Sequence, residues 1–231
     1  MSSSALMRTE DLWKVYRTGI AETPALRGVD LELGKREFTA TAGPSGSGKS
    51  TLLHLLGGLD RPTSGEIYLD GQALSGLSKD ELARLRLTRI GFVFQAYNLI
   101  PVLTVLENTA FVLELQGVPY RERIARARAV LAELGVEKYA HQFPNNLSGG
   151  EQQRVAVARA VVSQPVIVLA DEPTANLDTS ASLDLIDLMR RMNEEHETTF
   201  LFATHDTRLL DRVDRVIHLE DGRVVRDDRV G

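Results

Sequence analysis

One stretch of the sequence, residues 43–50, has the residue types and spacing needed to hold phosphate groups. It fits the pattern G-x-x-x-x-G-K-[ST] without a gap, a β-prone segment (38–42) precedes it, and an apolar segment typical of a helix start follows it. Glycines let successive backbone N–H groups turn toward phosphate oxygens, and the helix start adds its dipole and free N–H groups. The stretch therefore predicts a site for a nucleoside triphosphate. Its expected ligands are Gly43, Pro44, Ser45, Gly46, Ser47, Gly48, Lys49, Ser50 and Thr51.

Two side chains at the end of this stretch have distinct chemistry. Lys49 can reach the outer phosphates, and the hydroxyl of Ser50 is placed to ligate Mg²⁺. The alternative is a glycine- and serine-rich turn with a surface lysine. We disfavour it because every position of the pattern and both flanking elements are present.

A pair of carboxylates, Asp171 and Glu172, comes directly after the apolar run 166–170. Open α/β sheets bind their ligands at the carboxyl ends of the strands. We expect Asp171 to hold Mg²⁺, directly or through water, and Glu172 to polarise the attacking water. Two acids after a strand would otherwise be solvated surface residues, so the phosphate loop decides this interpretation.

His205 and Gln95 end two further strand-like segments, 199–204 and 90–94. The imidazole of His205 can contact the γ-phosphate and hold the water of Glu172. The amide of Gln95 can ligate Mg²⁺, orient water and sense whether the γ-phosphate is present. Each could instead be an ordinary surface residue, and only the neighbouring motif makes them candidates.

A second glycine-rich stretch, Leu147-Ser148-Gly149-Gly150-Glu151, also opens a helix. Its N–H groups and the Ser148 hydroxyl would make a second anion site. Because the first loop already serves one nucleotide, this site makes most sense if Ser148, Gly149 and Gly150 face the nucleotide of another subunit. The pattern therefore predicts a two-fold dimer whose sites are built from both chains.

Tyr16 or Trp13 could stack on a purine base, since a flat aromatic ring offers contact area. Packing within a sheet is the equally open alternative for both.

Composition limits the remaining possibilities. The chain has 231 residues, 43% of them hydrophobic, and a net charge of 27 − 32 = −5, which suits a full core and predicts no nucleic-acid partner. Cysteine is absent, so disulfides and thiolate metal sites are excluded. The first eight residues lack the apolar core of a signal peptide, and no stretch has the roughly 18 apolar residues of a membrane span. We expect a soluble, cytoplasmic protein that reaches a membrane only through another chain.

The elements that position these residues predict an α/β fold. Charged and apolar residues alternate over 8–37, as in an antiparallel sheet with one wet face, and buried strands alternate with helices later in the chain. Residues 104–116 and 120–134 have helical spacing; we interpret the arginines of the second as a solvated face. The predicted fold is a P-loop NTPase core with a mainly parallel sheet, an N-terminal antiparallel β-subdomain and an inserted α-helical subdomain.

We expect one domain over 1–231. Its catalytic core and antiparallel β-subdomain span 1–95 and 160–231, and its helical subdomain with the second glycine-rich loop spans 96–159.

Taken together, these motifs resemble the ATP-binding subunit of an ABC transporter, and the resemblance runs from about residue 8 to 226. The matching positions occur in the family's order and spacing: 43–50, Gln95, Leu147–Gln152, Val166–Glu172, Ala175-Asn176-Leu177-Asp178 and His205.

The resemblance implies a head-to-tail dimer with two ATP molecules between the phosphate loop of one copy and the signature loop 147–151 of the other. Tyr16 then becomes the expected adenine platform and Asp178 the contact between the two sites. ATP would close the dimer, Glu172 and His205 would position water, and Lys49 with Mg²⁺ would stabilise the transferring phosphoryl group.

Within the family the chain is most similar to the ATPases of lipoprotein-release, macrolide-export and cell-division complexes. The similarity lies in Tyr16-Arg17-Thr18-Gly19, in residues 56–65 and in residues 91–101. It implies a motor subunit that drives a multi-span membrane subunit docking near Gln95–Leu106, of the export or lipoprotein, lipid or peptide extraction type. The protein would lie on the inner face of the cell membrane through that partner, without the C-terminal regulatory domain of sugar-importer ATPases.

The alternative is a soluble ABC ATPase that acts on a cytosolic assembly; fractionation with membranes would discriminate the two. The chain also departs from the family's pattern. Thr39 and Thr41 stand where aliphatic residues are usual, so each adds a hydroxyl that needs a partner. Arg36 replaces the usual turn glycine, and Asn145-Asn146 precede the signature where one amide is more usual.

Overall fold

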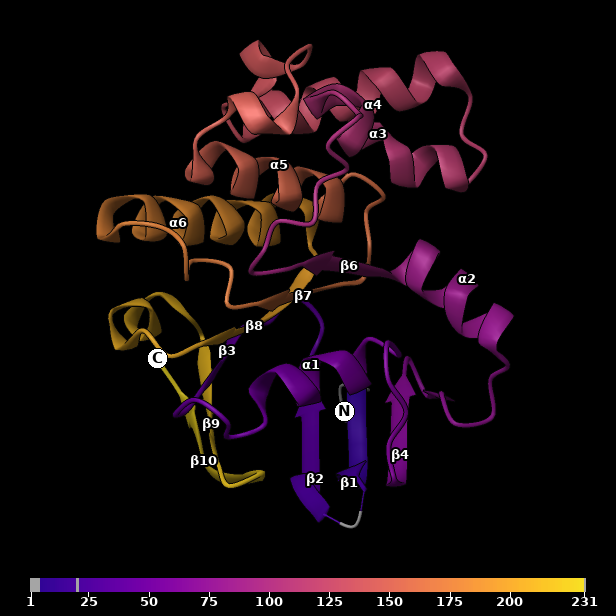
Figure 1. The fold of residues 1–231 in the computed structure, drawn as a ribbon, viewed down its shortest axis with the longest axis vertical. Coiled ribbons are helices and arrows are strands. Elements are labelled where there is room, and N and C mark those ends of the chain that lie inside the picture. Colours follow the sequence, from indigo (N-terminus) through magenta and orange to yellow (C-terminus); the bar gives the residue numbers. More distant parts are fainter. Residues whose placement is uncertain (1–4, 20, 231) are drawn as a thin grey trace.

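The structure, a computed structural model, describes residues 5–19 and 21–230. Residues 1–8 were predicted not to form a signal peptide, and the first four of them lie outside the described residues. Within the described part of the chain, ten strands form two sheets, with helices above and between them (Figure 1). None of the helices described is both long and apolar enough to cross a bilayer.

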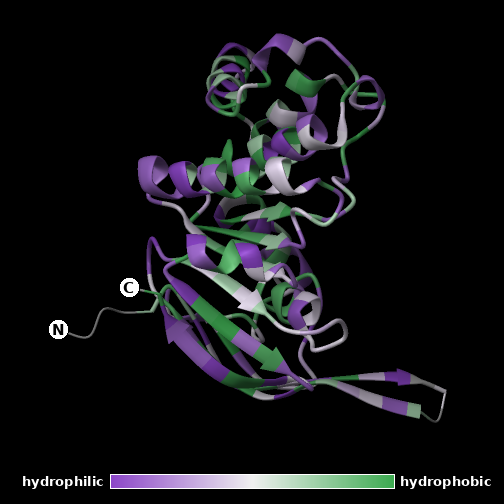
Figure 2. Ribbon diagram, turned by 90° about the vertical axis from the view of Figure 1, so that its left-hand side faces the viewer, coloured by the Kyte–Doolittle hydropathy of each residue, from purple (hydrophilic) through white to green (hydrophobic). Residues whose placement is uncertain are grey.

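The N-terminal sheet is antiparallel, as predicted, with the strand order β2-β1-β4-β5. Burial alternates along the second half of β2, where Val29, Leu31 and Leu33 are buried while Asp30 and Glu32 are exposed. Figure 2 shows β1 and β2 running out from the body of the molecule as a long two-stranded ribbon. The strands are β1 (Met7–Thr18), β2 (Ala21–Leu33), β4 (Ser64–Leu69) and β5 (Gln72–Ala73).

The central sheet has the order β10-β9-β3-β8-β7-β6. All neighbours run parallel except β9 and β10, which form the closing hairpin. Its strands are β3 (Phe38–Ala42), β6 (Ile90–Val93), β7 (Ile167–Asp171), β8 (Thr199–Thr204), β9 (Arg215–Glu220) and β10 (Arg223–Arg229). This sheet, with the antiparallel sheet beside it, confirms the predicted fold class.

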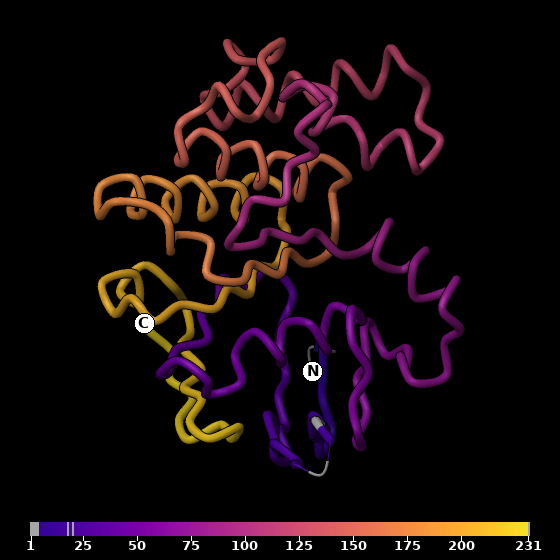
Figure 3. Tube along the Cα trace, viewed as in Figure 1, coloured from indigo at the N-terminus to yellow at the C-terminus, as the bar shows by residue number. Residues whose placement is uncertain are grey.

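The chain leaves the central sheet after β6, builds three helices, and returns as β7 (Figure 3). This is the helical insertion predicted from the sequence; its boundaries, 96–159, stay a prediction. The α-helices are α1 (Lys49–Leu56), α2 (Lys79–Arg89), α3 (Val105–Leu115), α4 (Tyr120–Glu133), α5 (Gly149–Val161) and α6 (Thr179–His196). Short 3₁₀ turns lie at Glu137–Tyr139, Pro144–Asn146 and Thr207–Arg212.

The sequence pattern did not reveal α2, which buries only Leu82 and Leu85. Two buried positions give too weak a hydrophobic period to identify a helix. Its start did carry a signal, since Ser78 and Glu81 form a reciprocal capping box.

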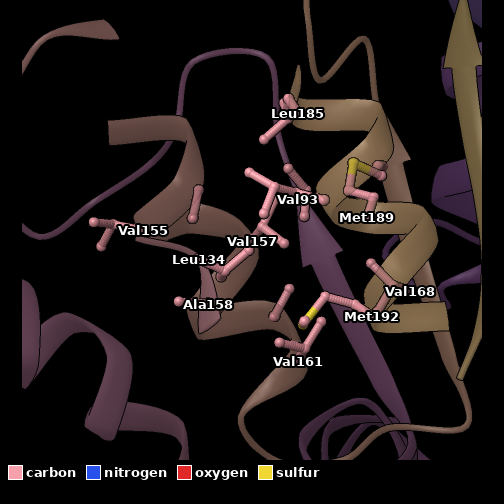
Figure 4. Packing of buried hydrophobic residues seen from close by; sticks show 14 of the residues in the cluster. Val93, Leu134, Val155, Val157, Ala158, Val161, Val168, Leu185, Met189 and Met192 are labelled. Carbon is pink, nitrogen blue, oxygen red and sulfur yellow. The ribbon is translucent and has the colours of Figure 1, made fainter. Parts of the chain in front are cut away.

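The central sheet separates two hydrophobic cores. Successive residues of a strand point to opposite faces; in β8, Phe200 and Phe202 join one core while Leu201 and Ala203 join the other. The first core lies under α3 to α6, and Figure 4 shows side chains of α5 and α6 meeting above the sheet. The second core lies between the sheet, α1 and the antiparallel strands. Burial on both faces explains why the parallel strands read as continuous apolar runs.

The departures in β3 have the consequence expected of buried hydroxyls. Thr39 and Thr41 are fully buried. The hydroxyl of Thr41 donates to the carbonyl of Phe202 at 3.4 Å, a weak bond. The hydroxyl of Thr39 has no hydrogen-bond partner among the described residues. The turn before β3 keeps the left-handed geometry that favours glycine, with φ of 64° at Arg36.

Candidate functional site

A cavity of about 500 Å³ lies at the carboxyl ends of β3, β6, β7 and β8. It brings together residues that are far apart in the sequence but follow neighbouring strands, as predicted. Its walls are formed by Ala25, Ser45, Gly46, Gly48, Lys49, Ser50, Thr51, Gln95, Glu172, Ala175 and His205.

The phosphate loop is shaped by close approaches that only glycine permits. Gly48 has a φ of 105°, and a Cβ on it would lie 2.5 Å from the carbonyl oxygen of Ala25. A Cβ on Gly43 would lie 2.1 Å from the carbonyl oxygen of Leu219. Gly48 also caps α1 without any side-chain hydrogen bond, and the first turn carries no acid. The N-terminal N–H groups of α1 therefore keep their positive field for an anion.

The side chain of Lys49 lies between this loop and a carboxylate. Its buried ammonium donates to the carbonyls of Gly43 and Pro44, at 2.8 and 3.0 Å, and lies 4.0 Å from Oε1 of Glu172. Backbone carbonyls are weaker partners than phosphate oxygens, so this cation can transfer its contacts to an incoming triphosphate.

Ser50 and Asp171 meet as a Mg²⁺ site requires. The Ser50 hydroxyl donates to Oδ1 of Asp171 at 2.8 Å, and Gln95 lines the same cavity. Hydroxyl, carboxylate and amide oxygens are the hard ligands that Mg²⁺ takes in proteins, so the donor set fits this ion. The imidazole of His54, one turn after Ser50 on α1, lies 3.8 Å from Oδ2 of Asp171.

Glu172 and His205 form a hydrogen-bonded pair. Nδ1 of His205 lies 2.9 Å from Oε2 of Glu172. Glu172 has a φ of 47°, in the left-handed region that costs a non-glycine residue roughly 1–3 kcal/mol. Its N–H donates to the carbonyl of Ala203, which ties the strained turn to β8. The carboxylate is thus oriented from both sides, by the fold and by the imidazole.

Three residues of the predicted phosphate loop lie outside the cavity. Gly43 and Pro44 line a separate hollow of about 310 Å³. Ser47 is buried, and its hydroxyl has no partner within the described part of the chain. The carbonyl of Ser47 accepts a hydrogen bond from the N–H of Gly222, in the turn between β9 and β10. The carbonyls of these three residues therefore hold the loop in place, those of Gly43 and Pro44 by accepting from Lys49 and that of Ser47 by accepting from Gly222.

The signature loop lies on another hollow, of about 400 Å³, lined by Ser148, Gly150 and Asp178 among others. The structure therefore does not bring these residues into the phosphate cavity of the same chain. Ser148 caps α5 in a reciprocal box, its hydroxyl lying 2.8 Å from Oε2 of Glu151. Hydrogen bonds from Tyr139 and Ser148 lower the pKa of Glu151, so an anionic carboxylate occupies this helix start.

Asp178 has a structural task in this chain. Its Oδ1 accepts from the N–H of Ala181 at 2.9 Å and caps α6. Tyr16 lies outside the residues that line the phosphate cavity, with its hydroxyl 3.3 Å from Asp60 and the ammonium of Lys14 over its ring. Its role toward adenine stays a prediction. Trp13 is half-buried.

Three residues in or beside this cavity were not predicted to take part in the site. Ala25 and Ala175 line the cavity with backbone and methyl groups, which no motif predicts. His54 could have been found, because it lies four residues after Ser50 and so on the same face of α1.

Residues 26–175 match the family model described as "ABC transporter". An "Uncharacterized ABC transporter ATP-binding protein" of Thermotoga maritima is 45% identical over 226 residues, covering 98% of this chain and 96% of the relative. The "Lipoprotein-releasing system ATP-binding protein LolD" of Hydrogenovibrio crunogenus is 44% identical over 223 residues, covering 96% and 97%.

Solved structures give the same result. The chain superposes on the "Dimeric Structure of MJ0796, a Bacterial ABC Transporter Cassette" with a TM-score of 0.91 and 41% identity, covering 97% of this chain and 99% of that one. The same cassette has also been solved in a dimeric post-hydrolysis state bound to ADP and Pi, with equal similarity.

Proposed function

The chain belongs to the ABC transporter family as an ATP-binding subunit, and from this premise we propose that it is the ATP-hydrolysing motor of a transporter or mechanotransmission complex. The observation that carries the proposal is the position of Glu172. Its carboxylate lies between His205 and Lys49, on the wall of the cavity that the phosphate loop forms. A carboxylate there can act on a water molecule beside the terminal phosphate.

The phosphate loop binds the triphosphate of ATP. The uncapped start of α1 offers its N–H groups, and Lys49 supplies a positive charge to the outer phosphates. Because the N–H of Gly222 donates to the carbonyl of Ser47 and Gly43 packs closely against the carbonyl of Leu219, these donors are preorganised. Preorganised donors stabilise charge that develops in the transition state without the cost of rearranging.

Ser50, Asp171 and Gln95 would hold Mg²⁺, which when bound neutralises charge on the phosphate oxygens. Glu172 accepts a proton from the attacking water. The imidazole of His205 keeps the carboxylate of Glu172 aimed at that water. Hydrolysis therefore depends on this chain's own carboxylate–imidazole pair.

The active unit is a dimer of two copies. Ser148, Gly149, Gly150 and Asp178 lie away from the phosphate cavity of their own chain, so they are free to face the ATP of a second copy. The similar cassette that has been solved as a dimer supports this arrangement. In this dimer Tyr16 is the adenine platform and Asp178 lies between the two sites.

The membrane partner docks beside Gln95–Leu106. Within this segment the side chain of Val102 is 77% exposed and so is available to a partner. The similarity to lipoprotein-releasing ATP-binding proteins supports an extraction or export task, with the chain peripheral on the inner face of the cell membrane. Pull-down of the chain from detergent-solubilised membranes should recover a multi-span protein; recovery of cytosolic proteins alone would favour a soluble ABC ATPase.

The catalytic assignment is tested with two substitutions. Lys49→Ala should abolish nucleotide binding or phosphate release. Glu172→Gln should bind ATP, lower phosphate release by about a hundredfold or more, and shift to the dimer in size exclusion with ATP. Glu195→Gln, an exposed glutamate on α6, is the control and should behave as the wild type. A Glu172→Gln chain with near-normal turnover would refute the assignment.

A further inference from the structure

The loop that follows β6 is held in an unfavourable conformation. Tyr97 and Asn98 are consecutive non-glycine residues with φ of 58° and 51°. A left-handed conformation costs a residue such as tyrosine roughly 1 kcal/mol or more, and asparagine less. Two such residues in a row are unusual, so neighbouring groups must hold them in place. Gln95, which lines the phosphate cavity, lies just before this pair.

Arg159 of α5 supplies the restraint. One arm of its guanidinium donates to the carbonyl of Asn98 at 2.5 Å, and the other donates to the carbonyl of Tyr97 at 2.9 Å. The rigid planar fork of arginine can span two successive carbonyls, which a lysine ammonium cannot do in the same geometry.

Arg159 is half-buried and makes hydrogen bonds to these carbonyls without forming an ion pair among the described residues. Burial lowers the pKa of its guanidinium, and no ion pair between Arg159 and a carboxylate is found among the described residues. A desolvated cation without a counter-ion is unfavourable in itself. The two hydrogen bonds to the loop therefore offset the cost of burying this cation.

The same helix touches the loop at its other end. A Cβ on Gly149, the first residue of α5, would lie 2.8 Å from the hydroxyl of Tyr97. Upstream, the carbonyl of Gln95 accepts a hydrogen bond from Asn176 at 2.9 Å. The loop is therefore fixed between the helix that carries the signature loop and the segment that follows Glu172.

We propose that Arg159 is a positioning residue for Gln95. It holds the strained pair Tyr97–Asn98 and thereby sets the place of the Gln95 amide in the cavity, so that α5 and Gln95 move as one unit. The inference rests on the proposed ATP hydrolysis, because it assigns Arg159 a part in presenting a metal ligand. It adds a residue that touches neither nucleotide nor metal.

Arg86 is the matched control. It lines the same groove as Arg159 and also donates to a backbone carbonyl, that of Gly58, at 2.7 Å. That carbonyl does not belong to the loop of Gln95. A purely structural role of a half-buried arginine predicts the same result for both residues.

The test compares Arg159→Lys with Arg86→Lys in the full chain. The first readout is the affinity of the ATP-bound protein for Mn²⁺, measured by electron paramagnetic resonance, and the second is kcat for phosphate release. Arg159→Lys should weaken Mn²⁺ binding and lower kcat by about tenfold each, because a displaced ligand loses its alignment. ATP affinity without metal should stay within about twofold, and Arg86→Lys should change none of these values beyond about twofold.

A double-mutant cycle with Gln95→Ala separates positioning from general destabilisation. On that background Arg159→Lys should alter kcat by less than about twofold, because the group it positions is gone. An undiminished tenfold effect there, or unchanged Mn²⁺ affinity with only a lower melting temperature, would overturn the proposal.

A variant on the loop itself guards against misfolding of the arginine variant. Asn98→Val places a β-branched residue at a φ of 51°, which should displace the loop and weaken Mn²⁺ binding several-fold; unchanged binding would again overturn the proposal. A wild-type chain that binds ATP and Mn²⁺ but releases no phosphate would contradict the proposed function alone. The Mn²⁺ comparison would still decide the role of Arg159.

Discussion

The two glycine-rich helix starts, those of α1 and α5, look alike in sequence and differ in how their free N–H groups are satisfied. At α1 the cap is a left-handed glycine, with no side-chain bond and no acid in the first turn. At α5, Ser148 and Glu151 close a reciprocal capping box, and the box brings its own negative charge. The start of α1 therefore leaves its N–H groups available to an anion, whereas the start of α5 is satisfied by side chains of its own chain.

The glycines differ in the same sense. Gly48 is required by the fold of its own chain, because of its φ of 105° and its close approach to Ala25. Gly150 is helical, and a Cβ on it would meet only the side chain of Ala181, at 4.0 Å. The fold of its own chain therefore leaves room for a side chain at Gly150.

The largest effect is expected from Gly48→Ala. The methyl group cannot fit 2.5 Å from a backbone oxygen, and the left-handed φ adds strain, so the loop must change shape. ATP affinity should fall by about a hundredfold or more, consistent with roughly 3 kcal/mol of combined strain. Nucleotide titration by calorimetry checks this. Gly46→Ala is the control, because Gly46 has a φ of 80° but a Cβ placed on it would meet no atom within 4 Å. This variant should lose much less ATP affinity. Equal losses in the two variants would argue against the close approach as the cause.

Gly150→Ala should separate the two helix starts most clearly. The single chain should bind ATP as before and melt slightly higher, since alanine favours a helix by up to about 1 kcal/mol over glycine. ATP-driven dimerisation of the Glu172→Gln chain should nevertheless fall by about tenfold, because the added methyl stands on the face proposed for the second copy. Size exclusion across an ATP series measures the dimer. Unchanged dimerisation would remove the signature loop from the proposed interface.

Glu151→Gln should change the charge at α5 while leaving its box intact. Without the carboxylate, α5 should bind the phosphates of the ATP held by the second copy about two- to fivefold more tightly, because one charge near a helix start contributes about 0.3–1 kcal/mol. Because the folded-state pKa of Glu151 is lowered, its stabilisation is present above the unfolded pKa and is lost as pH falls through the folded pKa. Thermal melts between pH 7 and pH 3 should therefore show a smaller acid loss in this variant.

Glu81→Gln provides the matched control for that charge. Glu81 closes the same kind of box with Ser78 at the start of α2, and its pKa is lowered by those hydrogen bonds. Its replacement should flatten the acid loss similarly but leave ATP-driven dimerisation unchanged. A gain in dimerisation with Glu81→Gln as well would mean that net charge, and not the helix start, is responsible.

Much of this contrast could be predicted, and some could not. The cluster of Lys49, Gln95, Glu172 and His205 followed from one rule, that side chains after neighbouring parallel strands meet at one edge of the sheet. The capping role of Glu151 also follows from its spacing from Ser148, whereas the glycines beside it favoured an anion from outside the chain. A local pattern does not say whether a helix start satisfies itself.

Other features depend on tertiary geometry. The hydrogen bonds of Arg159 join a helix to a loop some sixty residues away in sequence, and no periodicity encodes such a pair. The strand β10 extends to Arg229 because its charged residues pair along β9, whereas its apolar pattern ends early. Helix α2 could not be predicted from its hydrophobic period, because it buries only Leu82 and Leu85.

The smallest effect is expected from Thr39→Val. This variant changes the strand β3 that leads to the phosphate loop and leaves the loop itself unchanged. The buried hydroxyl has no partner in the part of the chain that the structure describes, so its removal should stabilise the fold by about 1 kcal/mol and raise the melting temperature by about 2–4 °C. ATP affinity should not change, because the loop's shape is set by its glycines. Thr41→Val, which loses a bond to Phe202, should gain less. A Thr39→Val chain that melts lower would show that the hydroxyl has an unseen use.

The phosphate loop is held by parts of the chain that are synthesised after it. The strand before the loop, β3, pairs with β8 on one side and β9 on the other, and the N–H of Gly222, in the turn after β9, donates to the carbonyl of Ser47. All of these belong to the last part of the chain. At a synthesis rate of about 5–20 residues per second, they leave the ribosome roughly ten seconds or more after the loop itself. The phosphate loop therefore completes these contacts only after residues 199–222 have been synthesised.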